Sequence, residues 1–445
     1  TWFDVLEIAE RPEQLASISG SERADTFDVA DTYENQDGGT WNTFEGLGGD
    51  DVITGTGKTK IGYTQADAGV TVDLGAGTGQ STDAEDAAGV GVDTFTGVRQ
   101  VQGSDYADVL TGSDAMWEAF RGRGGDDYID GGSEGGATIR PEGGGTGGWD
   151  RVDYIVAPSG VTVDLDAGTA SDGYGGTDTL VNIEQVQGSD YDDTLLGSDG
   201  RNSFRGRGGD DYIDGGDGDD RADYWDSPDG VTVDLSQVNA DGEVTASDGW
   251  GGTDTLISIE DVKGSHNADT LTGSDGDNDF EGLAGDDYID GGDGRDDVSY
   301  WNSPEGVTVD LSSANESGEV TVSDGWGDTD TLVSIERVGG SNYGDDVLTG
   351  DDANNSLYGR AGDDQLFGLG GRDWLRGDAG DDIIDGGDGS EDTAVYQYDP
   401  AGVDIDLSDA VDGVLTVTDG YGDTDTLIDI ERLVGTSHDD ILRGD

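Results

Sequence analysis

The chain has 445 residues, and its 101 Asp and Glu against 21 Lys and Arg give a formal net charge of −80. Glycine contributes 81 residues and cysteine none. Since Gly and Asp are poor helix formers and favour turns, this composition excludes a helical protein. The acidic excess argues against nucleic-acid binding and membrane insertion, and the lack of cysteine excludes disulfides and thiolate metal sites.

In chain order, a lead-in at residues 1–19 precedes five modules, which we expect to form one continuous solenoid rather than separate domains. A degenerate first module spans 20–111, and the second spans 112–196 with a Gly-rich insertion at 133–148, interpreted as a loop. The third, fourth and fifth modules span 197–272, 273–349 and 350–445.

Each module contains a long spacer built from two sequence blocks. The first block reads VTVDL from Val70, Val161, Val231 and Val307, with VDIDL from Val403. The second reads SDGYGGTDTLVNIEQVQGS from Ser171 and recurs from Ser247, Ser323 and Thr418. We interpret the first block as a strand, the DTLxxIExV part of the second as a pair of strands, and the whole spacer as a wider coil of the solenoid.

A nine-residue period follows the spacers. From Gly188 the chain runs GSDYDDTLL, GSDGRNSFR, GRGGDDYID and GGDGDDRAD, and similar runs start at Gly264 and Gly350. The first residue is Gly, the sixth is Asp or Asn, and the eighth is usually apolar. An acidic chain of low hydrophobicity is typical of disorder, but acids at a fixed period indicate a repeated structure instead.

The nonapeptide predicts six turn residues followed by a three-residue strand whose eighth position points inward. Two nonapeptides would make one flattened coil, and successive coils would stack as parallel strands about 4.8 Å apart. The inward residues would include Leu195, Phe204, Ile213, Leu271, Phe280 and Ile289. Asp side chains and turn carbonyls then face one another between coils, and such flexible, all-oxygen sites suit Ca²⁺ better than Mg²⁺.

These GGxGxDxUx nonapeptides resemble the RTX repeats, also called hemolysin-type calcium-binding repeats, of bacterial secreted proteins. The resemblance implies an all-β fold, a parallel β-roll or β-helix solenoid with several Ca²⁺ ions between its turns. It also implies type I secretion and an extracellular or cell-surface location. The spacer blocks look like those found among RTX repeats in long exported proteins, although that match is weaker.

The family's sixth-position ligand carries over to a set of Asp residues in this chain. They are Asp51, Asp108, Asp127, Asp193, Asp211, Asp220, Asp269, Asp287, Asp296, Asp364, Asp373, Asp382 and Asp440. Asn202, Asn278 and Asn355 hold the same position with a neutral oxygen, so we expect weaker or water-filled sites there. GSDAMWEAF from Gly112 and GSNYGDDVL from Gly340 are out of register, and we expect neither to bind an ion.

Other residues invite a functional interpretation but have simpler ones. His266 and His438 are the two histidines, and neither belongs to an HExxH motif, so we expect solvated surface side chains. The aromatics Tyr174, Trp250, Trp326 and Tyr421 recur at one position of the SDG[YW]G loop and could stack on sugar rings. Packing over the edge of a turn is the interpretation that we favour for these four.

Three functional classes remain open at this point. The solenoid could itself be a structural or adhesive product, such as a surface, matrix or filament component, or it could be the calcium-dependent secretion and folding region of a larger enzyme. A third possibility is an enzyme in its own right. Uniform tiling leaves no segment of about 100 residues for a catalytic domain, so we favour the structural or adhesive class and expect no catalysis.

The ends of the chain suggest self-association. Thr1 in place of Met is expected for a mature product or a fragment, and the residues before Asp445 begin another repeat rather than a cap. A solenoid without caps exposes unpaired strand edges. We therefore expect either a continuing array or head-to-tail stacking on other copies, with a surface polysaccharide as a further candidate partner.

Overall fold

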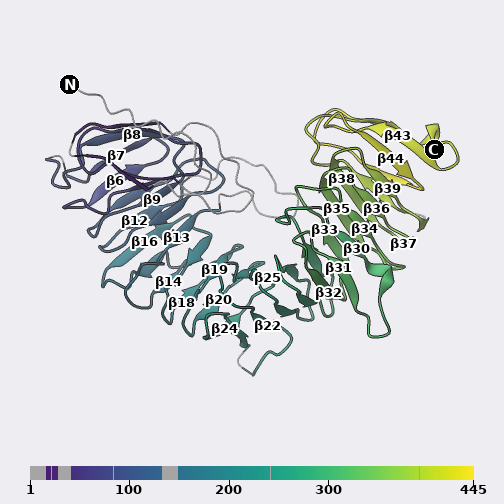
Figure 1. Cartoon of the computed structure of the whole chain (residues 1–445), viewed down its shortest axis with the longest axis horizontal. Helices are drawn as coiled ribbons and strands as arrows, with labels where there is room; N and C mark the ends of the chain where they lie inside the picture. The colour runs from purple at the N-terminus through teal and green to yellow at the C-terminus, as the bar shows by residue number, and fades with distance from the viewer. Residues whose placement is uncertain are drawn as a thin grey trace. The chain divides into compact units, whose positions relative to one another are not determined.

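The structure is a computed structural model that describes residues 17–21, 23–28, 42–83, 85–132, 149–240, 242–389 and 391–444. Within these residues strands dominate, and the helical segments are two short 3-10 turns, η1 (Leu311–Ser313) and η2 (Leu407–Asp409). The chain divides into two compact units, Thr1–Asp220 and Arg221–Asp445. Each unit contains two stacks of short strands, called here its parallel ladder and its mixed ladder (Figure 1).

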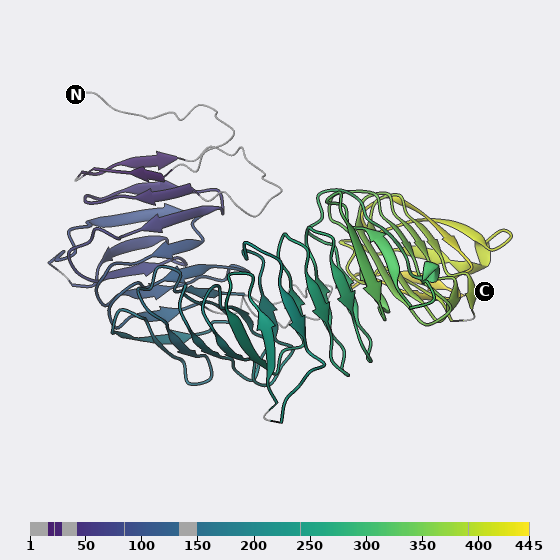
Figure 2. The same ribbon diagram turned by 60° about the horizontal axis from the view of Figure 1, so that its bottom comes forward.

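The parallel ladder of unit 1 pairs strands in one direction only. Its strands are β1 (Ser17–Ser19), β3 (Asn42–Glu45), β5 (Thr59–Gly62), β9 (Gln100–Gln102), β11 (Ala119–Arg121), β13 (Arg151–Asp153), β17 (Gln185–Gln187) and β19 (Ser203–Arg205). Figure 2 shows the unit 1 strands as successive rungs, in purple to blue.

The mixed ladder of unit 1 contains both parallel and antiparallel pairs. Its strands are β2 (Thr26–Asp28), β4 (Val52–Thr54), β6 (Val70–Asp73), β7 (Thr78–Ser81), β8 (Val92–Thr96), β10 (Val109–Thr111), β12 (Tyr128–Asp130), β14 (Thr162–Asp164), β15 (Thr169–Ser171), β16 (Thr177–Val181), β18 (Thr194–Leu196) and β20 (Tyr212–Asp214).

Unit 2 repeats this arrangement. Its parallel ladder contains β21 (Arg221–Asp223), β25 (Asp261–Lys263), β27 (Asp279–Glu281), β29 (Asp297–Ser299), β33 (Arg337–Gly339), β35 (Ser356–Ala361), β38 (Trp374–Ala379), β41 (Thr393–Val395) and β45 (Arg432–Val434). Its mixed ladder contains β22 (Thr232–Asp234), β23 (Val244–Ser247), β24 (Thr253–Ile257), β26 (Thr270–Thr272), β28 (Tyr288–Asp290), β30 (Thr308–Asp310), β31 (Val320–Ser323), β32 (Thr329–Val333), β34 (Val347–Thr349), β36 (Gln365–Phe367), β39 (Ile383–Asp385), β43 (Val414–Thr418) and β44 (Thr424–Ile428). Two small parallel pairs join β37 (Gly370–Gly371) to β40 (Asp388–Gly389) and β42 (Asp404–Asp406) to β46 (Ile441–Arg443).

The nonapeptides form the coil that their period predicts. Thr194 of β18 pairs with Tyr212 of β20, and Thr270 of β26 pairs with Tyr288 of β28, so two nonapeptides separate paired strands. Each strand covers positions seven to nine, and the eighth side chain points into the core between the two ladders. Leu195, Phe204, Ile213, Leu271, Phe280 and Ile289 are all buried. The parallel β-roll predicted from the repeats is therefore confirmed.

The spacers differ from the simple wide coils that we expected. In unit 1 the VTVDL strand β14 and the DTL strand β16 both pair antiparallel with an inserted strand, β15, which lies between them. β14 also pairs parallel with β18, and β16 pairs parallel with β12. Each spacer thus adds one antiparallel strand to the mixed ladder, because its turns are too tight for a full crossover.

Two predictions fall on parts of the chain that the structure does not describe. The Gly-rich insertion at 133–148 lies outside the described residues, and so does the lead-in at 1–19 apart from β1. The boundaries of the five modules stay predictions.

Candidate metal centres

The predicted sixth-position ligands occupy one place in the coil, the turn directly before a strand. Asp193 precedes β18, Asp287 precedes β28, and Asn278 precedes β27. All of the predicted ligand side chains are buried except that of Asp440, which is partly exposed. Within a unit, the residues that directly precede successive strands of one ladder are called here a carboxylate row. The repeat therefore buries rows of oxygen atoms at the strand entries, as the sequence predicted.

A hydrogen-bond chain runs along each carboxylate row. The backbone N–H of Asp269 donates to Oδ1 of Asp287, one coil later, at 2.8 Å. The N–H of Asp346 donates in the same way to Asp364 at 2.7 Å, and that of Asp364 donates to Asp382 at 2.9 Å. One oxygen of each carboxylate is thus used to join two coils, and its orientation is set by that bond.

The other oxygen, Oδ2, lies over the glycine that opens the same nonapeptide. A methyl group added at Gly368 would lie 2.4 Å from Oδ2 of Asp373 and 2.7 Å from the carbonyl oxygen of Gly386. The first position is glycine because no side chain fits beneath these oxygens. A carboxylate from one coil and a carbonyl from the next therefore approach the same point, which is the mixture of donors that Ca²⁺ accepts.

In one group of turns, a serine at the second position donates to the carboxylate. The N–H of Ser265 donates to Oδ2 of Asp269 at 2.6 Å, and its hydroxyl donates to Oδ1 at 2.9 Å. Ser189 makes the same two bonds to Asp193, at 2.6 and 2.8 Å. Ser104 with Asp108, and Ser341 with Asp346, follow this pattern. We call these capped turns.

In a second group Oδ2 has no hydrogen-bond partner, although the side chain is buried. These acids are Asp51, Asp127, Asp287, Asp296, Asp364, Asp373, Asp382 and Asp392. Their second residue is never Ser or Thr. Where φ of that residue is positive, as at Leu283 (74°), Arg123 (80°) and Arg360 (83°), the backbone is left-handed. We call these uncapped turns.

Burial raises the pKa of both groups of carboxylates, but to different degrees. Desolvation raises the pKa of Asp269 to about 6, and the bonds from Val231 and Ser265 limit this rise because they stabilise the charged form. The pKa of Asp287, the next acid in the row, rises to about 9, since desolvation is joined by repulsion from Asp330 and Asp269. The pKa of Asp364 rises to about 9 for similar reasons. Asp287 and Asp364 therefore hold a proton at neutral pH unless a cation takes its place.

The asparagine positions are closed by hydrogen bonds. Oδ1 of Asn278 accepts from the N–H of Ser274 at 2.7 Å, and its Nδ2 donates to the carbonyl of Glu260 at 2.8 Å. Asn202 and Asn355 use both ends of the amide in the same way, although their Nδ2 distances are longer, at 3.4 and 3.5 Å. Whether these positions bind ions weakly, as the sequence predicted, stays a prediction.

Several acids that sequence reasoning missed belong to the same rows. Glu118 and Asp346 come from the two nonapeptides judged out of register, where the acid is seventh rather than sixth. Both are buried and hydrogen-bonded to the serine at the second position. Asp392, also displaced by one residue, accepts the N–H of Asp373 at 2.9 Å. The turn absorbs the extra residue, so counting back from the strand would have identified these acids.

The spacers contribute carboxylates of their own. Oδ1 of Asp330 accepts the N–H of Asp287 at 3.1 Å, and its Oδ2 accepts the hydroxyl of the buried Tyr300 at 3.0 Å. Tyr154 holds Asp178 in the same manner. Oδ1 of Asp324, in the SDGWG loop, accepts three backbone N–H groups. These spacer acids continue the rows with their charge partly balanced by donors.

Side chains alone do not complete a metal site in the part of the chain that is described. No group of three or more His, Asp or Glu side chains there could hold a metal ion. An ion between two coils would therefore need backbone carbonyls as well as the carboxylates, and turns supply both kinds of oxygen. Buried Oδ2 atoms without donors, above glycines that leave space for oxygen, fit Ca²⁺ on these grounds.

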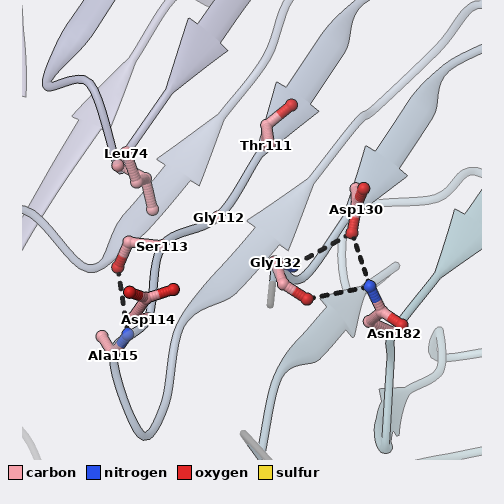
Figure 3. Close-up of a pocket in the computed structure, with 10 residues that line it drawn as sticks. Leu74, Thr111, Gly112, Ser113, Asp114, Ala115, Asp130, Gly132 and Asn182 are labelled. Atoms are coloured by element: carbon pink, nitrogen blue, oxygen red, sulfur yellow. Dashed lines mark hydrogen bonds between the residues drawn. The ribbon is translucent and has the colours of Figure 1, made fainter. Parts of the chain in front are cut away.

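A pocket of about 760 Å³ in unit 1 offers less chemistry (Figure 3). Asp130 lies at its wall and accepts from Nδ2 of Asn182 at 2.9 Å, while Ser113 accepts from the N–H of Ala115. Its described lining residues include no His, Cys or Lys. Within the described residues, no helix is long and apolar enough to span a bilayer.

The histidines and loop aromatics lie on the surface or pack on neighbouring residues. His266 and His438 are exposed. The rings of Trp326 and His266 pack edge to face, with their centroids 5.4 Å apart. The hydroxyl of Tyr174 donates to the carbonyl oxygen of Val156 at 2.7 Å. Packing over a turn edge, the role favoured from the sequence for Tyr174, Trp250, Trp326 and Tyr421, stays a prediction, and sugar stacking is untested.

A scan against protein-family models matches the chain to the RTX calcium-binding nonapeptide repeat. The matched residues are 120–134, 187–222, 264–298, 341–375 and 362–390. The chain therefore contains RTX calcium-binding nonapeptide repeats in these segments. The matched RTX segments contain most of the nonapeptides but not the VTVDL or DTL blocks, and the family description supports Ca²⁺ as the cofactor. A search of curated proteins finds no match.

Proposed function

We propose that this RTX protein is an extracellular structural or adhesive component, a β-roll that becomes rigid when Ca²⁺ binds and that performs no catalysis itself. The observation that carries the proposal is the repetition of one site, the uncapped carboxylate above a glycine, along both units. Uniform repetition favours a mechanical role, since a catalytic centre needs a distinct set of nucleophile, base and orienting group.

Charge couples folding to calcium. The chain has a formal net charge of −80, and each carboxylate row brings like charges together at successive coils. Asp287 lies between Asp269 and Asp330 in such a row, and both neighbours raise its pKa by repulsion. Bound Ca²⁺ would supply the positive charge between the uncapped acids. Without it, self-repulsion opposes packing of the coils.

This coupling suits secretion. At the submicromolar calcium of a cytosol the sites would stay empty and the chain unfolded, in a state that a type I exporter could move. At millimolar calcium outside the cell, weak sites of the extracellular kind would fill. We therefore propose a secreted or cell-surface location.

The test compares the purified chain with and without calcium. Circular dichroism in millimolar Ca²⁺ should show a β spectrum that is lost when a chelator removes the ion and that returns when Ca²⁺ is added back. Mg²⁺ at the same concentration serves as the control and should not restore it. A β spectrum that survives full chelation at neutral pH would contradict the proposal.

The structural role is tested separately from calcium binding. We propose that coils of one copy stack on coils of the next, so light scattering across a calcium titration should show assemblies that lengthen as Ca²⁺ rises. A strict monomer at millimolar calcium would argue against stacking. Turnover of a polysaccharide or peptide by the purified chain would overturn the non-catalytic assignment and favour an enzyme.

A further inference from the structure

Along a carboxylate row of the mixed ladder, one or two uncapped turns follow a capped turn. In unit 2, the capped Asp269 is followed one coil later by the uncapped Asp287, and then by Asp330, whose Oδ2 accepts the Tyr300 hydroxyl. In unit 1, the capped Asp108 is followed by the uncapped Asp127 and by Asp178, which is bonded to Tyr154. Each stretch of uncapped turns is thus bounded by carboxylates that already have donors.

Asp269 and Asp287 hold the same position in consecutive coils, and their turns differ at the second residue among others. Both are buried at 2% exposure, and both lie directly before a strand of the mixed ladder. Asp269 accepts bonds at both oxygens, from the N–H of Val231 and from Ser265. Asp287 accepts one bond at Oδ1 and none at Oδ2. The residue that differs at the second position is Ser265 in one turn and Leu283 in the other.

We propose that the second residue of each nonapeptide decides whether its turn takes Ca²⁺. A serine there satisfies the carboxylate with its N–H and hydroxyl, so a capped turn holds its charge without an ion. A left-handed residue such as Leu283 leaves Oδ2 without a donor, so an uncapped turn requires the ion. This inference rests on the proposed calcium-dependent function and specifies which turns carry it.

The backbone supports this division. The second residue has positive φ at Leu47 (68°), Leu283 (74°) and Leu369 (68°), a conformation that L-residues other than Gly, Asn and Asp adopt at a cost. Burying a carboxylate oxygen without a donor is also unfavourable. Both unfavourable features occur in the same turns, and a cation at Oδ2 would offset them together.

The asparagine turns extend the rule to the other ladder. Oδ1 of Asn278 accepts from Ser274, and its Nδ2 donates to the carbonyl oxygen of Glu260. An amide that uses both ends presents no charge and no free oxygen to an ion. The next acid in that row, Asp296, is uncapped, and its second residue is Gly292 with φ of 93°. In this row Ca²⁺ is therefore expected at Asp296 and not at Asn278.

Two opposite substitutions in the full-length chain test the inference. Ser265→Gly removes a cap and permits the left-handed conformation, so the number of Ca²⁺ ions bound per chain should rise by at least one. Leu283→Ser installs a cap before Asp287, so the number should fall by at least one. The measurement is equilibrium dialysis against Ca²⁺ at pH 7.5, with bound calcium determined by atomic emission.

Ser236→Gly is the matched control. The Ser236 hydroxyl also bonds to a carboxylate, Oδ1 of Asp234 at 2.6 Å, but the pair is exposed and lies outside the nonapeptides. This variant should bind the same number of ions as the unaltered chain. Circular dichroism at saturating Ca²⁺ establishes that each variant is folded, and Leu283→Ser decides the matter if Ser265→Gly does not fold.

The outcomes separate this inference from the proposed function. If the unaltered chain binds no Ca²⁺, the proposed function falls. If it binds Ca²⁺ but folded Ser265→Gly and Leu283→Ser bind the same number of ions as the control, only the role of the second residue is refuted.

Discussion

Acid should fold the calcium-free chain. Burial and neighbouring carboxylates raise the pKa of Asp127 and Asp382 to about 8, and that of Asp287 and Asp364 to about 9. A raised pKa in the folded state adds stability below the ordinary value near 4, and this stability is lost as the pH rises through the folded value. Protons can therefore replace cations at these uncapped turns, and the stability that they add falls as the pH rises.

The size of the effect follows from the number of protons. Between pH 5 and 7 these four acids are protonated in the folded chain and ionised in the unfolded one. Each bound proton changes the free energy of unfolding by about 1.4 kcal/mol per pH unit, so four give about 5 kcal/mol per unit. Over two pH units this is comparable to the whole stability of a typical domain, about 5–15 kcal/mol.

Urea unfolding followed by circular dichroism at pH 5, 6, 7 and 8, in buffer stripped of calcium by a chelating resin, measures this dependence. Asp287→Asn lacks one titrating group and should lower the slope by about 1.4 kcal/mol per pH unit. Asp293→Asn, an exposed neighbour in the next nonapeptide, should leave it unchanged. A calcium-free stability that stays constant or rises from pH 5 to pH 7 would refute the reasoning.

Three further predictions concern the glycine beneath the carboxylate, the buried core and the release of protons on calcium binding. Gly368→Ala places a methyl group 2.4 Å from Oδ2 of Asp373, so more Ca²⁺ should be needed for half-folding. Gly200→Ala, where the nearest atom to the added methyl group is at 3.9 Å, should shift this midpoint little. Equal midpoints for the two variants would contradict the role of the glycine beneath the carboxylate. Phe280→Ala, at a fully buried position, should lower the free energy of unfolding by about 3–5 kcal/mol in saturating Ca²⁺ without changing the ion count; a reduced count would mean that core and sites are not independent. Calcium binding at pH 7 should release protons, seen as a heat of binding that changes with the ionisation enthalpy of the buffer; identical heats in PIPES and Tris would contradict it.

The coil could be predicted from sequence because its signals are local and repeated. Glycine at position one, Asp or Asn at position six and an apolar residue at position eight recur often enough to set the register of most nonapeptides. Leu271 and Phe280 are consequently buried where the alternation placed them. A short strand with one inward residue leaves few alternatives once the turn is recognised.

The inserted antiparallel strands were harder to predict. β15 is three residues long, Thr169–Ser171, with a single buried side chain, Ala170. Such a segment has no period of its own, and its place between β14 and β16 depends on pairing with both. Tertiary pairing, rather than strand propensity, determines this element.

The division into capped and uncapped turns could not be predicted from the sequence either, although the serine that marks it is visible there. A serine after the first glycine has little meaning until the turn shows that its N–H and hydroxyl reach a carboxylate four residues later. Acids displaced by one residue, such as Asp346, were missed because the count began at the glycine. The distance to the strand, not to the glycine, is what the coil preserves.

The alternation within each strand separates what the coil requires from what it leaves open. In β28 the middle residue, Ile289, is buried, while Tyr288 and Asp290 flank it on the outer side of the ladder. At strands of this kind in the mixed ladder, positions seven and nine can therefore change identity without disturbing glycine, carboxylate or core. Proteins with the same coil could therefore display different side chains on this outer face. A chosen pattern of side chains could also be engineered there, at a spacing of one strand.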